Sequence, residues 1–142
     1  SGLQIPLLQD STARGSDLEL LFDYLAAYHG SLRNVEEVLS RIRAEDEIVI
    51  WGAGMHTEML ENIFSIRGRL NCVRLIDADV EKQGRSWRGL RIEDPSAIRE
   101  MNKPFLTLIS SYGNQEAIAA FLHDSGIPDD RIVRLYSNPT PY

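Results

Sequence analysis

The segment Ile48–Thr57 has the sequence IVIWGAGMHT, and it decides the fold that we predict for this chain. A run of β-branched and aromatic side chains stops at Gly52 and Gly54, and a helix-forming stretch follows at once. A strand, a tight turn and a helix N-terminus in this order form a phosphate-binding corner, because the helix dipole and the N–H groups at the helix start attract anions. The segment therefore indicates an anionic ligand.

The glycine pattern of this corner is incomplete. A dinucleotide fingerprint has the form G-x-G-x-x-G, and its third glycine lets the helix pack closely on the strand. Thr57 stands at that position here. It can donate a hydroxyl group, although its branched Cβ reduces close contact between helix and strand. The alternative is an ordinary strand–helix turn that uses its glycines only for its own geometry.

The composition is that of an ordinary globular protein. The 142 residues are 43% hydrophobic and 25% charged, with a net charge of -6, and this length is enough for one domain with its own core. The negative charge argues against nucleic acid or an anionic membrane as the main partner. No apolar run approaches the ~20 residues that cross a bilayer. No signal peptide is visible, so we expect a cytoplasmic protein.

Neither a disulfide framework nor a metal site is expected. Cys72 is the single cysteine, so a disulfide within the chain and a multi-cysteine zinc site are both unavailable. Its apolar neighbours indicate a buried thiol at the start of a strand. His56 follows the glycine loop without other metal ligands near it. The chain begins with Ser1 and Gly2, which is typical of a processed tag on a fragment of a longer protein.

Apolar periodicity predicts two helices before the glycine loop and alternating strands and helices after it. A capping box begins the first helix at Asp17, Gly30 ends it, and Ser31 caps the second. Gly68 is expected to close the helix that follows the glycine loop. The predicted strands are 48–51, 72–77, 90–92, 105–109 and 131–136; the later helices are 58–66, 94–101 and 114–124, and 78–88 is a polar loop.

Strands that alternate with helices imply right-handed crossovers and a parallel sheet that is covered on both faces. We therefore predict an α/β fold: a short Rossmann-like parallel sheet of about five strands in the order 3-2-1-4-5, with an N-terminal helical hairpin. The predicted divisions are an arm or linker (1–16), the hairpin (17–45), the Rossmann-like domain (46–137) and a tail (138–142).

The ligand crevice of such a sheet lies beyond the carboxyl ends of its strands, where the strand order reverses. Three predicted loops meet there, over residues 52–57, 77–84 and 110–114. Gly52 and Gly54 would let backbone N–H groups approach a phosphate at the positive end of the following helix. These two glycines are therefore the first candidates for ligand contact.

Polar side chains of these loops supply the other candidate contacts. Asp77 ends the second strand, where an acid often binds ribose hydroxyls, although it lies somewhat farther from Gly52 than the usual ~20 residues. A loop acid or a helix cap is the alternative. His56 and Ser110 would contact a phosphate or a sugar in the same crevice. Lys82 could meet a phosphate, but we favour a solvated loop charge for it.

No catalytic centre can be identified. Tyr112 follows the fourth strand, but Glu116 stands where a short-chain reductase has the lysine of its Tyr-x-x-x-Lys pair. Asn114 is expected to cap a helix. The chain also lacks G-x-S-x-G, G-x-x-x-x-G-K and a paired His-Glu metal motif. The cofactor is left open between NAD(P) and a nucleotide sugar.

A series of short motifs resembles a known family. The motifs are Trp51-Gly-Ala-Gly54, Ile76-Asp77-Ala78-Asp79, Lys82-Gln83-Gly84, Gly89-Leu90-Arg91-Ile92 and Ser110-Ser111-Tyr112. Their order is similar to that of a small Rossmann-like domain found at the C-terminus of sugar C-methyltransferases and at the N-terminus of sugar O- or N-acyltransferases. The match covers residues 46–136 and leaves the helical hairpin outside.

This resemblance implies that the glycine loop, His56, Asp77 and Ser110 hold a nucleotide or a nucleotide sugar. Two positions depart from the family pattern, because Thr57 replaces a glycine and Arg91 replaces a proline. The methyltransferase core and the acyltransferase repeat are both missing from this sequence. The resemblance therefore supports binding more than catalysis.

We accordingly predict a nucleotide- or nucleotide-sugar-binding domain of a carbohydrate-modifying enzyme, in which another domain carries the methyl or acyl transfer. One alternative is a ligand-free Rossmann-like module that dimerises or docks through its helical hairpin. A second alternative is an NAD(P)-linked reductase. The expected partner is a small-molecule nucleotide, and both a homodimer and a neighbouring domain of a longer chain remain open.

Overall fold

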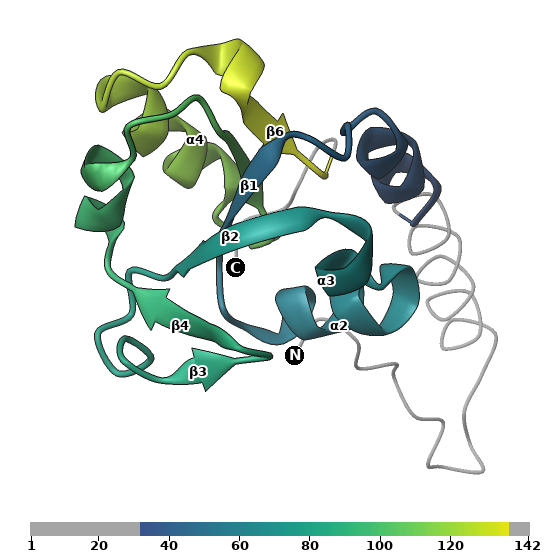
Figure 1. The fold of residues 1–142 in the computed structure, drawn as a ribbon, viewed down its shortest axis with the longest axis horizontal. Helices are drawn as coiled ribbons and strands as arrows, with labels where there is room; N and C mark the ends of the chain where they lie inside the picture. Colours follow the sequence, from purple (N-terminus) through teal and green to yellow (C-terminus); the bar gives the residue numbers. More distant parts are fainter. Residues whose placement is uncertain (1–31, 137–142) are drawn as a thin grey trace, which may run out of the picture.

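The computed structural model describes residues 32–136. The predicted arm (1–16), the first hairpin helix (17–30) and the tail (138–142) lie outside the described residues. A six-stranded sheet in the order β3-β4-β2-β1-β5-β6 forms the centre of the described part. Figure 1 shows α2 and α3 on one side of this sheet and α4 on the other, so the α/β prediction is confirmed.

Five strands run parallel, as predicted, and their order is the expected 3-2-1-4-5. They are β2 (Asn71–Ile76), β1 (Glu47–Trp51), β4 (Leu90–Glu93), β5 (Leu106–Ile109) and β6 (Ile132–Arg134). The sixth strand, β3 (Ser86–Trp87), pairs antiparallel with β4 inside the segment predicted as a polar loop. A strand of two residues is too short to show an alternating apolar pattern, so the sequence does not predict it.

The helices are α2 (Met55–Phe64), α3 (Ile66–Arg69), α4 (Gln115–Asp124), the 3₁₀ helices η1 (Pro95–Glu100) and η2 (Asp129–Arg131), and a helical segment over 32–40. The prediction of a single helix over 58–66 is wrong at both ends. The helix starts at Met55 and stops at Ser65, whose φ of 53° is left-handed. Gly68 therefore lies within α3 and does not end a helix, contrary to the prediction.

Two hydrophobic layers hold the sheet between the helices. Ile48 and Ile50 of β1 face the layer that contains α2 and α3, whereas Val49 and Trp51 face the layer that contains η1 and α4. These four side chains are 0–5% exposed, and burial of such a side chain contributes about 1.5–3 kcal/mol. Because β1 is packed on both faces, it holds the first residue of the glycine loop, Gly52, in a fixed position.

The helical segment 32–40 joins the same core. Val35 and Leu39 are each 1% exposed and belong to the α2–α3 layer. The side-chain amide of Asn34 donates to the Leu135 carbonyl oxygen at 2.7 Å, which ties the segment to the chain after β6. The segment that was predicted as the second helix of a hairpin therefore packs on the sheet. Among the described residues, no helix is both long and apolar enough to cross a membrane.

Candidate functional site

A cleft of about 840 Å³ opens beside the carboxyl ends of β2, β1 and β5. This is the place where the strand order reverses, as the fold prediction required. All six predicted binding residues lie in its wall. The lining residues are Trp51, Gly52, Gly54, Met55, His56, Thr57, Asp77, Ala78, Asp79, Lys82, Pro95, Ser110, Ser111, Asn114, Ala117, Ile118 and Phe121.

Gly52 is required by the geometry of the loop. Its φ is +119°, a conformation that residues with a side chain rarely adopt. A Cβ atom at this position would lie 2.7 Å from Ser110 Oγ and 3.3 Å from the backbone nitrogen of Ser111. The N–H of Gly52 also donates to the Ile76 carbonyl oxygen at 2.7 Å. The loop is therefore packed directly on the end of β5.

The hydroxyl groups of Thr57 and Ser110 form hydrogen bonds with the backbone of the glycine loop. Both residues are buried, at 1% and 0% exposure, and their Oγ atoms lie 2.6 Å apart. The Thr57 hydroxyl donates to the Gly52 carbonyl oxygen, and Ser110 Oγ lies 3.0 Å from the same oxygen. Their hydrogen bonds to backbone carbonyl oxygens position the loop in this structure. Both residues also line the cleft, and their contact with a ligand stays a prediction.

Gly54 differs from Gly52 because the fold does not require a glycine there. Its φ is −114° and ψ is −159°, an extended conformation that any residue adopts. An added Cβ atom would meet only the Lys82 Nζ, at 3.5 Å. Gly54 is the N-cap of α2, and as a glycine it has no side chain that could cap this helix. The positive end of α2 therefore lies in the cleft wall, with no side chain at its N-cap.

Asp77 links the loop after β2 to the glycine loop. Its Oδ2 accepts a hydrogen bond from the Ala53 N–H at 2.8 Å, and its Oδ1 accepts one from the Asp79 N–H at 2.8 Å. The carboxylate side chain keeps 16% of its surface exposed. The predicted acid therefore reaches the crevice, and it also fixes the backbone of the glycine loop.

Lys82 lies in the cleft wall, whereas the sequence favoured a solvated loop charge for it. The loop after β2 folds back on itself, because the Lys82 N–H donates to the Asp79 carbonyl oxygen and the Gln83 side chain donates to that of Asp77. This turn brings Lys82 Nζ to 3.8 Å from Asp77 Oδ2, over Gly54. The motif Lys82-Gln83-Gly84 was the available signal, but it does not reveal that the loop turns inward.

Three aromatic rings form a compact group beside the start of α2. The His56 and Tyr112 rings stack with centroids 5.7 Å apart and 15° between their planes. Tyr136 meets both edge-on, at 6.1 Å from His56 and 5.0 Å from Tyr112. Burial lowers the pKa of His56 below its ordinary value, which favours the neutral imidazole. We call these three residues the aromatic cluster.

The other wall of the cleft is apolar. The rings of Trp51 and Phe121 meet edge-on at 5.4 Å, and Pro95, Ala117 and Ile118 complete this apolar lobe. Phe121 is 44% exposed, although it is a large aromatic side chain. Asn114 stands at the N-cap of α4 as predicted, but its side chain makes no capping hydrogen bond. A polar loop and an apolar lobe thus face each other across the cleft.

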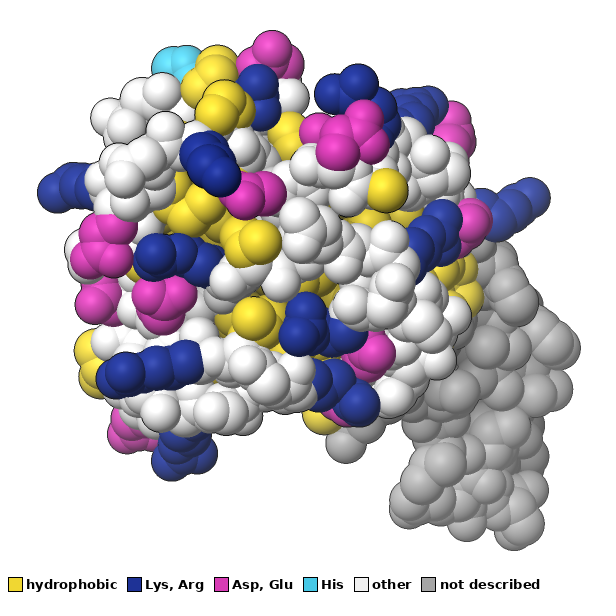
Figure 2. Space-filling model, in the orientation of Figure 1, with side chains coloured by type: hydrophobic (Ala, Val, Ile, Leu, Met, Phe, Trp, Pro, Cys, Tyr) yellow, Lys and Arg dark blue, Asp and Glu magenta, His cyan; other side chains and the backbone are white. Residues whose placement is uncertain are grey.

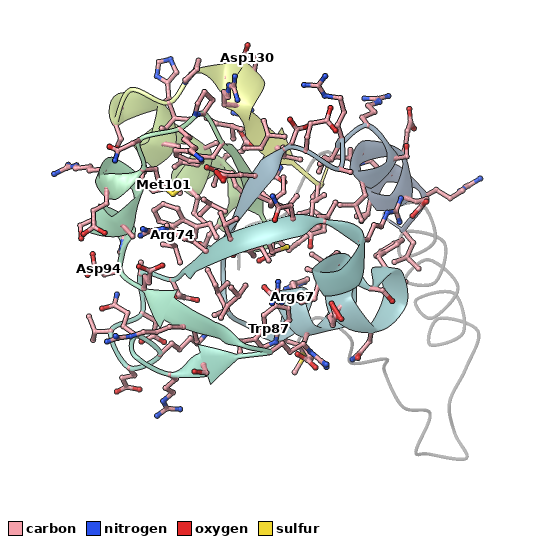
Figure 3. All side chains as sticks on the ribbon, viewed as in Figure 1. Arg67, Arg74, Trp87, Asp94, Met101 and Asp130 are labelled. Atoms are coloured by element: carbon pink, nitrogen blue, oxygen red, sulfur yellow. The ribbon has the colours of Figure 1, made fainter. Side chains whose placement is uncertain are left out.

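The β3–β4 hairpin is held against α2 by one carboxylate. Trp87 lies beside α2 in Figure 3, and its Nε1 donates to Glu58 Oε2 at 2.6 Å. Arg88 donates to the other oxygen of Glu58. The hydrogen bonds from Arg88 and Trp87 lower the pKa of Glu58. This contact fixes the hairpin end of the segment that carries Lys82, and pairing of β2 in the sheet fixes the other end.

The electrostatic setting is mixed. Figure 2 shows acidic and basic side chains interspersed over the visible face, with no continuous basic surface there. Arg74, labelled in Figure 3, pairs with Glu93 at 3.0 Å and with Glu100 at 3.4 Å. Within the described range, no group of three or more His, Cys, Asp and Glu side chains is placed to hold a metal ion.

Comparison with known structures finds similar folds at low identity. UDP-D-quinovosamine 4-dehydrogenase from Vibrio fischeri is 21% identical, over 57% of this chain and 72% of that chain, with a TM-score of 0.44. RSP in complex with beta-NADH is 18% identical, over 62% of this chain and 51% of that chain, with a TM-score of 0.48. A second RSP structure, described as a Rex-family repressor, is 18% identical over 89% and 65%, with a TM-score of 0.48.

These similarities extend to the fold and no further. None of the three names is that of a methyltransferase or an acyltransferase, so the link to sugar-modifying transferases rests on the sequence motifs alone. No curated protein matches the chain. One protein family matches residues 44–133, which include the whole sheet except the last residue of β6. Because this match spans more than half of the sequence, the chain belongs to the family described as C2185-like, N-terminal.

Proposed function

We propose that this chain is a nucleotide-binding domain and that the phosphates of the ligand lie over Gly54 and the first turn of α2. The observation that carries the proposal is the position of Lys82 Nζ, which faces Gly54 at the start of α2, where the N-cap residue has no side chain. A cation and a helix N-terminus both attract phosphate oxygens. The missing side chain at Gly54 leaves room for close approach.

Asp77 supports the ribose of the same ligand. Each of its carboxylate oxygens accepts one backbone hydrogen bond and has a further lone pair. The exposed part of the carboxylate lies at the cleft, close to the proposed phosphate position. A ribose hydroxyl can therefore donate to Asp77 without displacing the bond from Ala53. Lys82 offsets the negative charge that Asp77 would present to the phosphates.

The apolar lobe supports a nucleobase. Trp51 and Phe121 offer aromatic surface, and Ile118 and Pro95 offer aliphatic surface within the same cleft. Ligand sites combine such apolar walls with a few polar groups that fix orientation, in volumes of roughly 300–1,000 Å³. Phe121 is partly exposed to water. A flat ring that covers it would remove apolar surface from water, which favours binding.

The proposal includes a nucleotide sugar as the first ligand to test. The motifs from Trp51 to Ser111 support this choice through their resemblance to domains of sugar-modifying transferases. The role in carbohydrate modification, with transfer carried by another domain, is part of the proposal and rests on that resemblance. NAD(P) is the second ligand to test. Neither the reductase nor the interaction-module alternative gains a specific observation from the cleft.

A ligand panel with one variant pair tests the proposal. Thermal shift and calorimetry would use ADP, UDP, UDP-glucose and NAD+, and a ligand at ~100 times its Kd should add about 2.7 kcal/mol to stability. Loss of a hydrogen bond to a charged group costs about 1.5–3 kcal/mol, so Lys82→Gln should weaken binding roughly 10- to 100-fold.

The matched control is Lys103→Gln, which makes the same change at the amino end of the sheet, in a groove with Arg43 and Arg131. It should leave binding unchanged, because that groove does not share residues with the cleft. The proposal fails if no nucleotide binds. It also fails if both lysine variants lose the same affinity, since the effect would then reflect net charge.

A further inference from the structure

We infer that the half of the cleft built by β5 and α4 receives an uncharged, hydroxyl-bearing sugar on the outer phosphate of the ligand, with Ser111 and Asn114 as its polar contacts. The inference rests on the proposed function and names the sugar class and the sugar contacts of the same site. Three observations support it: the position of the loop between β5 and α4, the polar side chains of that loop, and the distribution of charge in the cleft wall.

The loop between β5 and α4 lies directly beside the glycine loop. The Ser110 N–H donates to the Trp51 carbonyl oxygen at 3.0 Å, so the ends of β5 and β1 are joined at the cleft. A Cβ atom on Gly52 would lie 3.3 Å from the Ser111 nitrogen and 3.6 Å from the Ser111 Cβ. Asp77 lies on the other side of β1, because β2 and β5 flank that strand. A ligand with its ribose at Asp77 and its phosphates at the start of α2 therefore directs its far end toward the β5–α4 loop.

The two serines of this loop differ in what their hydroxyls do. Ser110 is 0% exposed, and its hydroxyl contacts the Thr57 hydroxyl and the carbonyl oxygens of Trp51 and Gly52. Ser111 is partly exposed and lines the cleft. Its hydroxyl has no hydrogen-bond partner in the part of the chain that the structure describes. A ligand can therefore bond to Ser111 without breaking an existing contact.

Asn114 is the second polar side chain on this side of the cleft. It occupies the N-cap position of α4, where an asparagine usually accepts a hydrogen bond from the helix backbone, but its side chain makes no such bond. The residue is exposed and lines the cleft. Its carboxamide offers two N–H donors and an acceptor oxygen, and the Ser111 hydroxyl both donates and accepts. This combination suits the hydroxyl groups of a sugar, which also donate and accept.

The charged side chains of the cleft wall lie on one side of it. Asp77, Asp79 and Lys82 all come from the loop after β2. Glu116 of α4 pairs with Arg134 at 3.1 Å and is not part of the wall. A charged group that loses water without a partner lowers affinity, so a uronic acid would need a cation here and an amino sugar would need an anion. The wall residues from β5, its loop and α4 are all uncharged: Ser110, Ser111, Asn114, Ala117, Ile118 and Phe121.

Calorimetry on the full chain tests the inference with two ligand pairs, UDP with UDP-glucose and ADP with ADP-glucose. The members of a pair differ in the sugar, and the pair whose base binds is decisive. Asn114→Ala should weaken binding of the glucose ester about 3- to 10-fold through loss of a neutral hydrogen bond, with binding of the nucleoside diphosphate unchanged. Ser111→Ala should show the same selective loss. Lys82→Gln should weaken both members, because both carry the phosphates.

The matched control is Asn102→Ala. Asn102 is exposed, precedes β5 and lies outside the cleft wall, so its replacement should leave the affinity for both members of the pair unchanged. A thermal scan checks that Asn114→Ala is folded. If it is not, Asn114→Ser keeps a helix-capping residue and still removes the carboxamide.

The sugar class is tested with UDP-glucuronate, or with ADP-glucuronate if the adenine pair binds. Its carboxylate meets no cation on the β5–α4 side of the cleft wall, so we expect it to bind about tenfold more weakly than the glucose ester. A glucuronate ester that binds as tightly as the glucose ester would overturn the assignment to an uncharged sugar.

The outcomes separate this inference from the proposed function. If the nucleoside diphosphate binds but its glucose ester does not, the inference is overturned and nucleotide binding stands. The same conclusion follows if the folded Ser111 and Asn114 variants bind the glucose ester as wild-type protein does, or lose affinity equally for both members of the pair. Binding of no nucleotide at all refutes the proposed function itself.

Discussion

Replacement of Gly52 by alanine is the most informative perturbation of the loop. The added Cβ atom would lie 2.7 Å from Ser110 Oγ, so the serine must shift. Ser110 shares its hydrogen bonds with Thr57 and with the Gly52 carbonyl oxygen, and all of these atoms are buried. The substitution therefore strains the backbone and disturbs a buried hydroxyl pair at the same time.

Both costs of Gly52→Ala can be estimated. A residue with a side chain held at a φ of +119° costs about 1–3 kcal/mol. A buried hydroxyl that loses its partner costs a further amount of about 1–3 kcal/mol. Gly52→Ala should therefore lower the free energy of unfolding by about 2–6 kcal/mol. In a Ser110→Ala background only the backbone part should remain, since the clashing oxygen is gone.

Urea denaturation of the four proteins of this double-mutant cycle provides the assay. Circular dichroism follows unfolding, and the slope m shows whether two-state behaviour is kept. We expect Gly52→Ala to cost about 1–3 kcal/mol less when Ser110 is already alanine. An equal cost in both backgrounds would refute the contact between Gly52 and Ser110. A neutral Gly52→Ala would refute the loop conformation as a whole.

Three further predictions concern other parts of the molecule. Thr107 is 0% exposed, and its hydroxyl has no hydrogen-bond partner among residues 32–136. Thr107→Val should therefore raise the free energy of unfolding, measured by urea titration, by about 1–2 kcal/mol. A destabilised variant would show that the hydroxyl does have a partner. Burial raises the pKa of the Cys72 thiol, so a thiol reagent should modify it slowly in native protein and fast in denaturant; fast native reaction would contradict its burial. The hydrogen bonds from Arg88 and Trp87 lower the pKa of Glu58 in the folded state, so its contribution to stability exists at neutral pH and is lost in acid, as pH falls below the ordinary pKa of a glutamate and through the lowered pKa of the folded state. Glu58→Gln should flatten that part of the stability profile, and an unchanged profile would count against the contacts of Glu58.

The central elements of the fold could be predicted because their signals are local. The β1 sequence is apolar without alternation, and glycines follow it, so strand, turn and helix were visible in one short segment. Elements with weaker local signals were missed or misplaced. The strand β3 is only two residues long, and the break at Ser65 depends on a left-handed residue that is not glycine. Packing against α2 and β4 decides both features.

The predicted site residues all reached one cleft, but their individual roles needed the structure. The hydroxyls of Thr57 and Ser110 are in contact although they are 53 residues apart in the sequence, and no sequence motif predicts that contact. Lys82 reaches Gly54 because Asp77 and Asp79 accept backbone hydrogen bonds that turn the loop inward. The aromatic cluster likewise joins residues from α2, the β5–α4 loop and the segment after β6. Such contacts arise from tertiary structure.

The most direct test of the account is a crystal structure of the chain with the nucleoside diphosphate, ADP or UDP, that binds more tightly. The account predicts phosphate oxygens at about 3 Å from the backbone N–H groups at the start of α2 and from Lys82 Nζ. It also predicts a ribose at Asp77 and a base beside Phe121. A ligand bound elsewhere on the molecule, or with its phosphates away from Gly54 and Lys82, would contradict the central claim.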